Sequence, residues 1–437
     1  MSAIRSLRIK LGNTDVGSLF AIDDGRTYFR FDTAYAMNPD SPVLSISYLG
    51  ENALETQTAL LDPSLRNNIG AGHGRLPSFF RNLLPEGVLR KHIVSESGVG
   101  PDDELGLLAF CGTDLPGNVV ALSENLDEPA LARLITQGND SYEMSSYQLP
   151  TPDATSLSGV QPKISLVQEP GGRYVMRSKN DAGLHYIGKL PASDYQGLPE
   201  VEHLSLQLAA KAGVNVCTAE LLPLSSIASQ LPFALRDDAR NFLLVHRFDR
   251  DVDTESKRRH MEDFAQILNI APEDKYKGDY ATLGLVLQDS SSKGEEDILE
   301  LIRRIKVNEM LGNFDAHLKN FSLLYCTPTS ACLSPAYDIV AYAAYLRGQG
   351  HGMMFYSEAG KSKTLSPAVL RRLSNIWAIP EKRLALVVGE TVELAVRNWP
   401  MMIRDSAIAE SQKDQLLMHF ESNETVAGLQ KRMAKAK

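Results

Sequence analysis

The chain has 437 residues and a formal net charge of −9 at pH 7, and 43% of its residues are hydrophobic and 23% charged. This composition is typical of globular proteins and excludes a disordered chain, and the length predicts two or three domains. The acidic balance argues against indiscriminate nucleic-acid binding, which depends on lysine and arginine contacts to phosphates.

The four cysteines are scattered without a CxxC pair, at Cys111, Cys217, Cys326 and Cys332. A structural zinc site usually draws on two close pairs of ligands, so no metal–thiolate site is expected. Unpatterned cysteines are typical of a reducing compartment. The N-terminus lacks the apolar core of a signal peptide, and no apolar run approaches the roughly 20 residues that span a bilayer. We therefore expect a cytoplasmic protein without a membrane segment.

The first 120 residues or so read as a strand-rich unit. Short runs of aromatic and β-branched residues, bounded by turn residues, predict strands at 17–22 and 27–31. Apolar residues at helical spacing predict a helix from Ser78 to about Val94, which Pro85 is expected to break or kink.

A polar stretch from about 121 to 155 marks a boundary, after which strands precede helices. The predicted elements are strands at 160–167, 173–176, 185–190 and 241–248, and a helix at about 199–212 ended by Gly213. From Met261 onward the periodicity is mostly helical. This order indicates an α+β chain with a helical C-terminal part.

The most informative segment carries Asp315 and Asn320 at the spacing D-x-x-x-x-N, and Asp338 follows after a predicted strand pair. Phosphoryl transfer needs an acceptor for the attacking hydroxyl's proton and oxygen ligands that hold Mg²⁺ on the phosphates. Asp315 fits the first role, and Asn320 and Asp338 fit the second. The alternative is that these are polar loop residues that cap helices.

Three further features fit a kinase. Lys189 near the end of a predicted strand could reach ATP phosphates and pair with Glu202 on the next helix, although both also suit exposed positions. The small residues around Ser158 and Gly159 could cradle phosphates through backbone N–H groups, or form an ordinary loop. His317 is expected to orient the catalytic loop by hydrogen bonding, without a catalytic proton role.

Five motifs in this order resemble the HipA family of toxin–antitoxin kinases. They are Ser156–Lys163, Tyr186–Pro191, Val245–Arg250, Asn313–Asn320 and Ala336–Ile339. Phe80–Gly87 is also similar to the N-terminal domain of that family. The resemblance implies a bilobal fold similar to protein kinases and phosphoinositide kinases. Its parts would be an N-terminal β-rich subdomain (1–120), a kinase N-lobe with linker and phosphate-binding loop (121–245) and a helical C-lobe (246–437).

The resemblance also implies roles for individual residues. Asp315 matches the catalytic base, Asn320 and Asp338 the Mg²⁺ ligands, and Lys189 the lysine that binds ATP. The hinge that touches adenine would be His246, Arg247 and Phe248, where the family often has Glu or Gln in place of His246. Ser156 matches a serine that is autophosphorylated to inactivate the kinase, and Ser158 is an alternative acceptor.

The implied function is a toxin Ser/Thr protein kinase that uses ATP and Mg²⁺. Its substrate would be an aminoacyl-tRNA synthetase, and a helix-turn-helix antitoxin would neutralise it and bind operator DNA with it. One alternative is a corepressor scaffold in which a basic cluster, Lys361, Lys363, Arg371 and Arg372, touches DNA; that cluster also fits a solvated helix face. A small-molecule or lipid kinase of the same fold is a further alternative.

Overall fold

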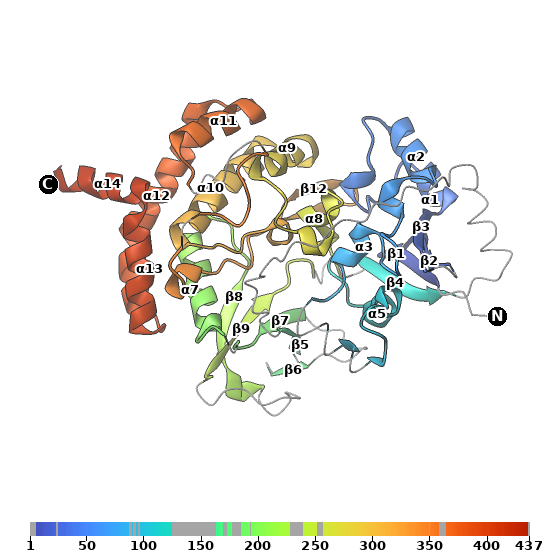
Figure 1. Ribbon diagram of the computed structural model, residues 1–437, viewed down its shortest axis with the longest axis horizontal. Coiled ribbons are helices and arrows are strands. Elements are labelled where there is room, and N and C mark those ends of the chain that lie inside the picture. The colour runs from blue at the N-terminus through green and yellow to red at the C-terminus, as the bar shows by residue number, and fades with distance from the viewer. Residues whose placement is uncertain are drawn as a thin grey trace. The chain divides into compact units, whose positions relative to one another are not determined.

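The computed structural model describes residues 6–22, 25–86, 90, 93–94, 97–124, 163–168, 173–176, 185–192, 194–227, 239–250, 257–348, 350–357 and 364–435. The chain divides into two compact units, whose elements are labelled in Figure 1. Unit 1 draws on Met1–Val160, Asp253–Glu273 and Thr327–Thr329. Unit 2 draws on Gln161–Val252, Asp274–Cys326 and Ser330–Lys437.

Unit 1 contains a four-stranded antiparallel sheet with the order β3-β2-β1-β4. Its strands are β1 (Ser6–Leu11), β2 (Thr14–Ala21), β3 (Thr27–Phe31) and β4 (Val119–Glu124). The two strands predicted from the sequence are therefore confirmed as β2 and β3. Gly12 takes a left-handed φ of 60° in the tight turn between β1 and β2, a conformation that costs glycine little.

Short helices accompany this sheet in unit 1. They are α1 (Thr33–Met37), α2 (Ala53–Leu61), α3 (Ser78–Asn82), α5 (Glu104–Cys111) and α8 (Phe264–Ile267), and a further strand is β10 (Met261–Asp263). The predicted helix from Ser78 to about Val94 is broken, as expected: α3 ends at Asn82, and Arg90, Ile93 and Val94 are again helical. Pro85 explains the early end, since the residue before a proline disfavours the helical region. The rings of Phe29 and Phe80 pack edge to face, 4.8 Å between centroids, in the core of this unit.

Unit 2 contains a five-stranded antiparallel sheet with the order β6-β5-β7-β9-β8. Its strands are β5 (Lys163–Gln168), β6 (Tyr174–Met176), β7 (His185–Lys189), β8 (Ala219–Pro223) and β9 (Asn241–His246). All four strands predicted for this part of the chain are present within a few residues. Strand β8 was not predicted. The register places Lys163 of β5 opposite Lys189 of β7.

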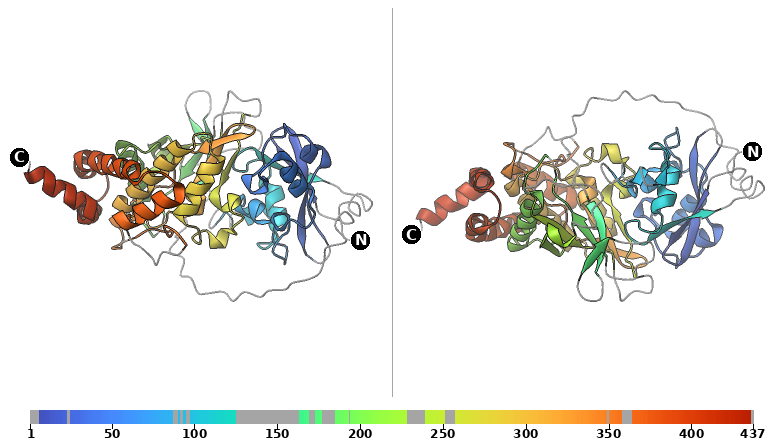
Figure 2. Two further views of the ribbon diagram at one scale, coloured as in Figure 1. Left: turned by 90° about the horizontal axis from the view of Figure 1, so that it is seen from above. Right: turned by 90° about the horizontal axis from the view of Figure 1, so that it is seen from below.

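The remainder of unit 2 is mostly helical, as the periodicity predicts. Its elements are α7 (Leu198–Lys211), α9 (Tyr280–Ser290), α10 (Glu295–Leu311), β11 (Ser322–Thr327), β12 (Ser330–Leu333), α11 (Pro367–Trp377), α12 (Glu381–Asp405), α13 (Glu410–Ser422) and α14 (Glu424–Lys435). Two further views show α13 and α14 together at one end of this unit (Figure 2). The adjacent strands β11 and β12 are the strand pair expected before Asp338.

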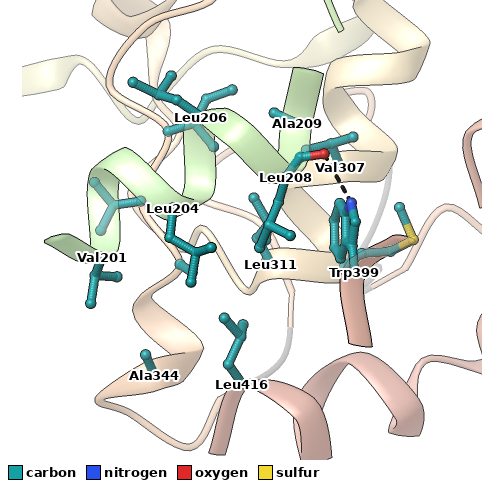
Figure 3. Close-up of a cluster of buried hydrophobic side chains, with 14 of the residues drawn as sticks. Val201, Leu204, Leu206, Leu208, Ala209, Val307, Leu311, Ala344, Trp399 and Leu416 are labelled. Atoms are coloured by element: carbon teal, nitrogen blue, oxygen red, sulfur yellow. Dashed lines mark hydrogen bonds between the residues drawn. The ribbon is translucent and has the colours of Figure 1, made fainter. Parts of the chain in front are cut away.

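Helix α7 packs its apolar face into the main core of unit 2. Val201, Leu204 and Leu208 are buried there (Figure 3). The indole Nε1 of Trp399 on α12 donates a hydrogen bond to the Leu208 carbonyl oxygen, 2.9 Å away. After α7 the chain leaves the helix at Gly213, whose φ is 92°, as predicted. This packing fixes α7, and therefore the polar residues it carries toward the sheet.

Glu309 on α10 joins three parts of unit 2 and is only 5% exposed. Its carboxylate accepts hydrogen bonds from Lys306 Nζ (2.5 Å), the Leu365 backbone N–H (2.6 Å) and Asn423 Nδ2 (2.8 Å). Burial alone would raise the pKa of Glu309, but the hydrogen bond from His351 and the charge of Lys306 hold it well below its usual range. The ionised carboxylate therefore stabilises the folded state.

We expect Glu309→Gln to lower the free energy of unfolding by roughly 3–5 kcal/mol, because it leaves the buried Lys306 charge unpaired. Since the pKa of Glu309 is depressed on folding, its contribution is present above the ordinary glutamate pKa of about 4.3 and is lost as the pH falls below it. Thermal melting from pH 7 to pH 3 should show a shallower acid decline in the variant. Glu410→Gln is the control, because Glu410 is 84% exposed. Equal melting of wild type and Glu309→Gln at pH 7 would contradict the assignment.

Candidate active site

A partly buried ion cluster joins the sheet, helix α7 and the chain after β12. Lys189 ends the central strand β7, and its Nζ donates hydrogen bonds to Glu202 Oε1 of α7 and to Asp338 Oδ1. The Lys189 side chain is 6% exposed and that of Glu202 is 1% exposed. Lys163 Nζ lies 3.7 Å from Asp338 Oδ2, because the β5–β7 register places it beside Lys189. Lys189 and Glu202 are thus buried partners, and neither lies on an exposed face.

Asp338 is fixed by backbone contacts on both sides of it. The Ala336 N–H donates to the Asn215 carbonyl, and the Cys217 N–H donates to the Ala336 carbonyl, each at 2.8 Å. The Ala341 N–H donates to Ser205 Oγ at 2.9 Å, and Ser205 lies one turn after Glu202 on α7. Helix α7 and the segment that follows it therefore position Asp338. Its φ of 53° is uncommon for a non-glycine residue and persists where the surrounding structure imposes it.

The opposite charges of this cluster keep Asp338 and Lys189 in their ionised forms. Burial would raise the pKa of Asp338, but Lys163 and Lys189 hold it well below its usual range, so the carboxylate is ionised at neutral pH. Burial would lower the pKa of Lys189, but Asp338 and Glu202 raise it above its ordinary value. An ionised carboxylate beside two ammonium groups is suited to a hard divalent cation and to phosphate oxygens.

Asn320 lies in the loop after α10 and faces Asp338. The His317 backbone N–H donates to Asn320 Oδ1 at 2.9 Å, and Asn320 Nδ2 lies 3.5 Å from Asp338 Oδ2. The Leu318 N–H donates to the Lys275 carbonyl at 3.1 Å, which ties this loop to the chain before α9. Asn320 therefore lies next to Asp338, with its amide nitrogen facing the carboxylate and its Oδ1 bonded to the loop backbone. Carbonyl and carboxylate oxygens are ligands that Mg²⁺ accepts, so both side chains are candidate ligands of one cation.

Asp315 precedes Asn320 in the same loop and is half-buried. The Tyr276 hydroxyl donates to Asp315 Oδ1, and the Tyr342 hydroxyl lies 3.5 Å from Oδ2. Burial raises the pKa of Asp315 above its ordinary value, although the Tyr276 hydrogen bond and Lys275 oppose that rise. The His317 ring contacts the Tyr276 ring edge to face, 5.1 Å between centroids. The imidazole thus packs beside the phenol that holds Asp315.

The three predicted hinge residues follow one another at the end of β9. His246 Nε2 lies 3.0 Å from Glu220 Oε1. The Arg247 guanidinium donates to both oxygens of Asp249, at 3.0 and 2.8 Å. The Phe248 ring lies 5.6 Å from that of Tyr337, the neighbour of Asp338. The side chains of His246 and Arg247 are therefore engaged within the protein, while Phe248 packs next to the ion cluster.

Several predicted residues lie outside the described residues, namely Ser156, Ser158, Gly159, Lys361 and Lys363. Arg371 forms an exposed ion pair with Glu381 at 3.0 Å, and Arg372 lies 5.9 Å from the centre of the Tyr356 ring.

Sequence reasoning assigned no role to Lys163, Ser205, Tyr276 or Tyr342. Only Lys163 had a usable signal, because it lies within a predicted strand (160–167) and ends the motif Ser156–Lys163 that contains the small-residue loop.

Within the described part of the chain, no group of three His, Cys, Asp or Glu side chains is arranged to hold a metal ion. Cys326 and Cys332 have Sγ atoms 3.5 Å apart and remain free thiols. None of the described helices has the length and apolar character needed to cross a membrane.

Comparisons with known proteins agree on one family. Residues 7–122 match the HipA N-terminal domain, and residues 155–399 match the HipA-like C-terminal domain. The putative kinase Y4dM of Sinorhizobium fredii is 33% identical over 432 residues, 98% of this chain and 96% of that protein. The putative kinase Y4mE of the same organism is 28% identical over 73% of this chain and 80% of its own length.

The fold is also similar to that of a solved structure. It is HipA of Shewanella oneidensis MR-1, in a complex with HipB and its operator DNA. The similarity covers 95% of this chain and 96% of that one, with a TM-score of 0.66 and 19% sequence identity. This likeness shows a shared mixed α/β fold.

Proposed function

The chain belongs to the HipA family, and on that premise we propose that it is an Mg²⁺- and ATP-dependent Ser/Thr protein kinase of a toxin–antitoxin system. The observation that carries the proposal is the contact of Lys189 with both Glu202 and Asp338, beside a loop that presents Asp315 and Asn320. Protein kinases need this combination of strand lysine, helix glutamate, metal-binding aspartate and catalytic-loop D-x-x-x-x-N. The names of the relatives Y4dM and Y4mE support kinase activity.

Each residue has a defined task in this proposal. Lys189 donates hydrogen bonds to the α- and β-phosphates, and Glu202 holds its ammonium group in place. Asn320 and Asp338 hold Mg²⁺, which neutralises charge on the phosphates when bound. Asp315 accepts the proton of the attacking serine or threonine hydroxyl. Phe248 packs at the hinge. A hydrogen bond to adenine would have to come from backbone groups other than the N–H groups of His246 and Arg247, which donate to the Thr218 and His185 carbonyls.

Regulation and partners are also proposals. Autophosphorylation of Ser156 or Ser158 would add about −1.5 to −2 charge, which repels ATP phosphates and switches the kinase off. We propose a HipB-like helix-turn-helix antitoxin and operator DNA as partners, supported by the composition of the Shewanella complex. The same complex favours a corepressor role as a second function that can coexist with catalysis. The proposed substrate is an aminoacyl-tRNA synthetase. The proposed architecture is bilobal and kinase-like, with parts at 1–120, 121–245 and 246–437.

Lys189→Met tests the proposed ATP site. Removing the ammonium group should lower kcat/KM for ATP by roughly 10- to 150-fold, because a hydrogen bond to a charged group is worth about 1.5–3 kcal/mol. Steady-state assays with varied Mg²⁺-ATP would measure the effect. Lys277→Met is the matched control, since Lys277 is 71% exposed and pairs only with Asp274 in the described contacts. Unchanged kinetics in a folded Lys189→Met protein would refute this nucleotide site.

A further inference from the structure

Tyr276 is held against the catalytic loop from two directions. Its hydroxyl donates a hydrogen bond to Asp315 Oδ1, and its ring packs against that of His317. The preceding residue, Lys275, accepts a hydrogen bond from the Leu318 N–H through its backbone carbonyl. Tyr276 is nevertheless 38% exposed, so its hydroxyl contact can be reached from solvent. The loop therefore positions the Tyr276–Asp315 hydrogen bond, and another hydroxyl group arriving from solvent can compete for it.

The Tyr276 hydroxyl makes with Asp315 Oδ1 the kind of contact that a substrate hydroxyl would need. A general base must accept a hydrogen bond from the group whose proton it removes. The Tyr342 hydroxyl lies 3.5 Å from Asp315 Oδ2, beyond the usual O–H···O range of about 2.5–3.0 Å. Asp315 Oδ1 thus already carries the hydroxyl contact that catalysis would require of an acceptor.

We propose that Tyr276 is an internal stand-in for the acceptor hydroxyl, which holds Asp315 until a protein acceptor displaces it. The inference rests on the proposed kinase function and adds the regulation of its base. A water molecule entering alone would have to displace the phenol without the binding contacts that a protein substrate brings. The contact would therefore suppress transfer of the γ-phosphoryl group to water, in which a water oxygen attacks phosphorus, the bond to ADP breaks and Asp315 receives the proton.

The test is the rate of ATP hydrolysis by the full chain with Mg²⁺ and no protein acceptor. Tyr276→Phe should raise this rate by roughly tenfold, the lower end of what a hydrogen bond to a charged group is worth, with KM for ATP within about twofold of wild type. Tyr345→Phe is the control and should match wild type, because the Tyr345 hydroxyl donates instead to the Gln196 carbonyl at 3.0 Å. A lower or unchanged rate in Tyr276→Phe would overturn the proposal.

Two further variants separate this inference from the kinase assignment. The rise caused by Tyr276→Phe should vanish in an Asp315→Asn background, since the two residues would act through one contact. A rise that persists there would place the effect of Tyr276 elsewhere and overturn the stand-in role. Hydrolysis by wild type no faster than by Asp315→Asn would instead defeat the assignment of Asp315 as base, and the inference with it.

Discussion

Asp315→Asn is expected to lower phosphoryl transfer by roughly 10²- to 10⁴-fold, the usual contribution of a positioned general base. The amide cannot accept the hydroxyl proton, but it keeps the size of the carboxylate and a contact to Tyr276. Binding of ATP should therefore persist, because the phosphate and metal ligands lie on other residues. Transfer of radiolabel from ATP, measured beside a calorimetric ATP titration, separates the two effects.

Asp274→Asn is the matched control for that experiment. Asp274 lies in the same unit, is 41% exposed and pairs with Lys277 at 2.8 Å, so its loss should leave transfer unchanged. Near-normal turnover in Asp315→Asn would show that another group removes the proton.

Asp338→Asn should weaken ATP binding in the presence of Mg²⁺ by roughly 10- to 150-fold, because the lost interaction is a hydrogen-bonded charge worth about 1.5–3 kcal/mol. The side chain keeps its shape, but Lys163 and Lys189 lose the anion between them. The effect should shrink when EDTA removes the cation, since Asp338 then has no metal to hold. Calorimetric titrations with and without Mg²⁺ measure this difference. Identical titrations of wild type and variant in Mg²⁺ would exclude Asp338 as a metal ligand.

The sequence predicted much of the sheet and helix that build the site. Apolar runs bounded by turn residues located β5, β7 and β9, and apolar residues at helical spacing located α7, each within a few residues. A lysine at the end of a strand and a glutamate in the next helix then suggested the pair of Lys189 and Glu202, and the structure brings these side chains into contact. Local patterns were sufficient here because both residues lie on regular elements that follow one another in the chain.

Other features of the site depend on long-range contacts that a local pattern does not contain. Tyr276 lies 39 positions from Asp315, and neither side of that pair belongs to a periodic segment. The hydrogen bond from the Ala341 N–H to Ser205 Oγ joins residues 136 positions apart. Contacts of this kind surround Asp338, whose φ is left-handed. Strand β8 was missed because its sequence, Ala-Glu-Leu-Leu-Pro, lacks β-branched and aromatic residues and alternation.

The most direct test of the kinase assignment is incubation of the purified chain with Mg²⁺ and γ-radiolabelled ATP, alone and with a cell extract, beside Asp315→Asn. We predict label on the chain itself and on one extract protein, both absent with the variant. Mass spectrometry of the labelled chain would then decide between Ser156 and Ser158. A folded wild-type chain, unmodified at both serines, that labels nothing would contradict the kinase assignment and leave the corepressor role as the function to test.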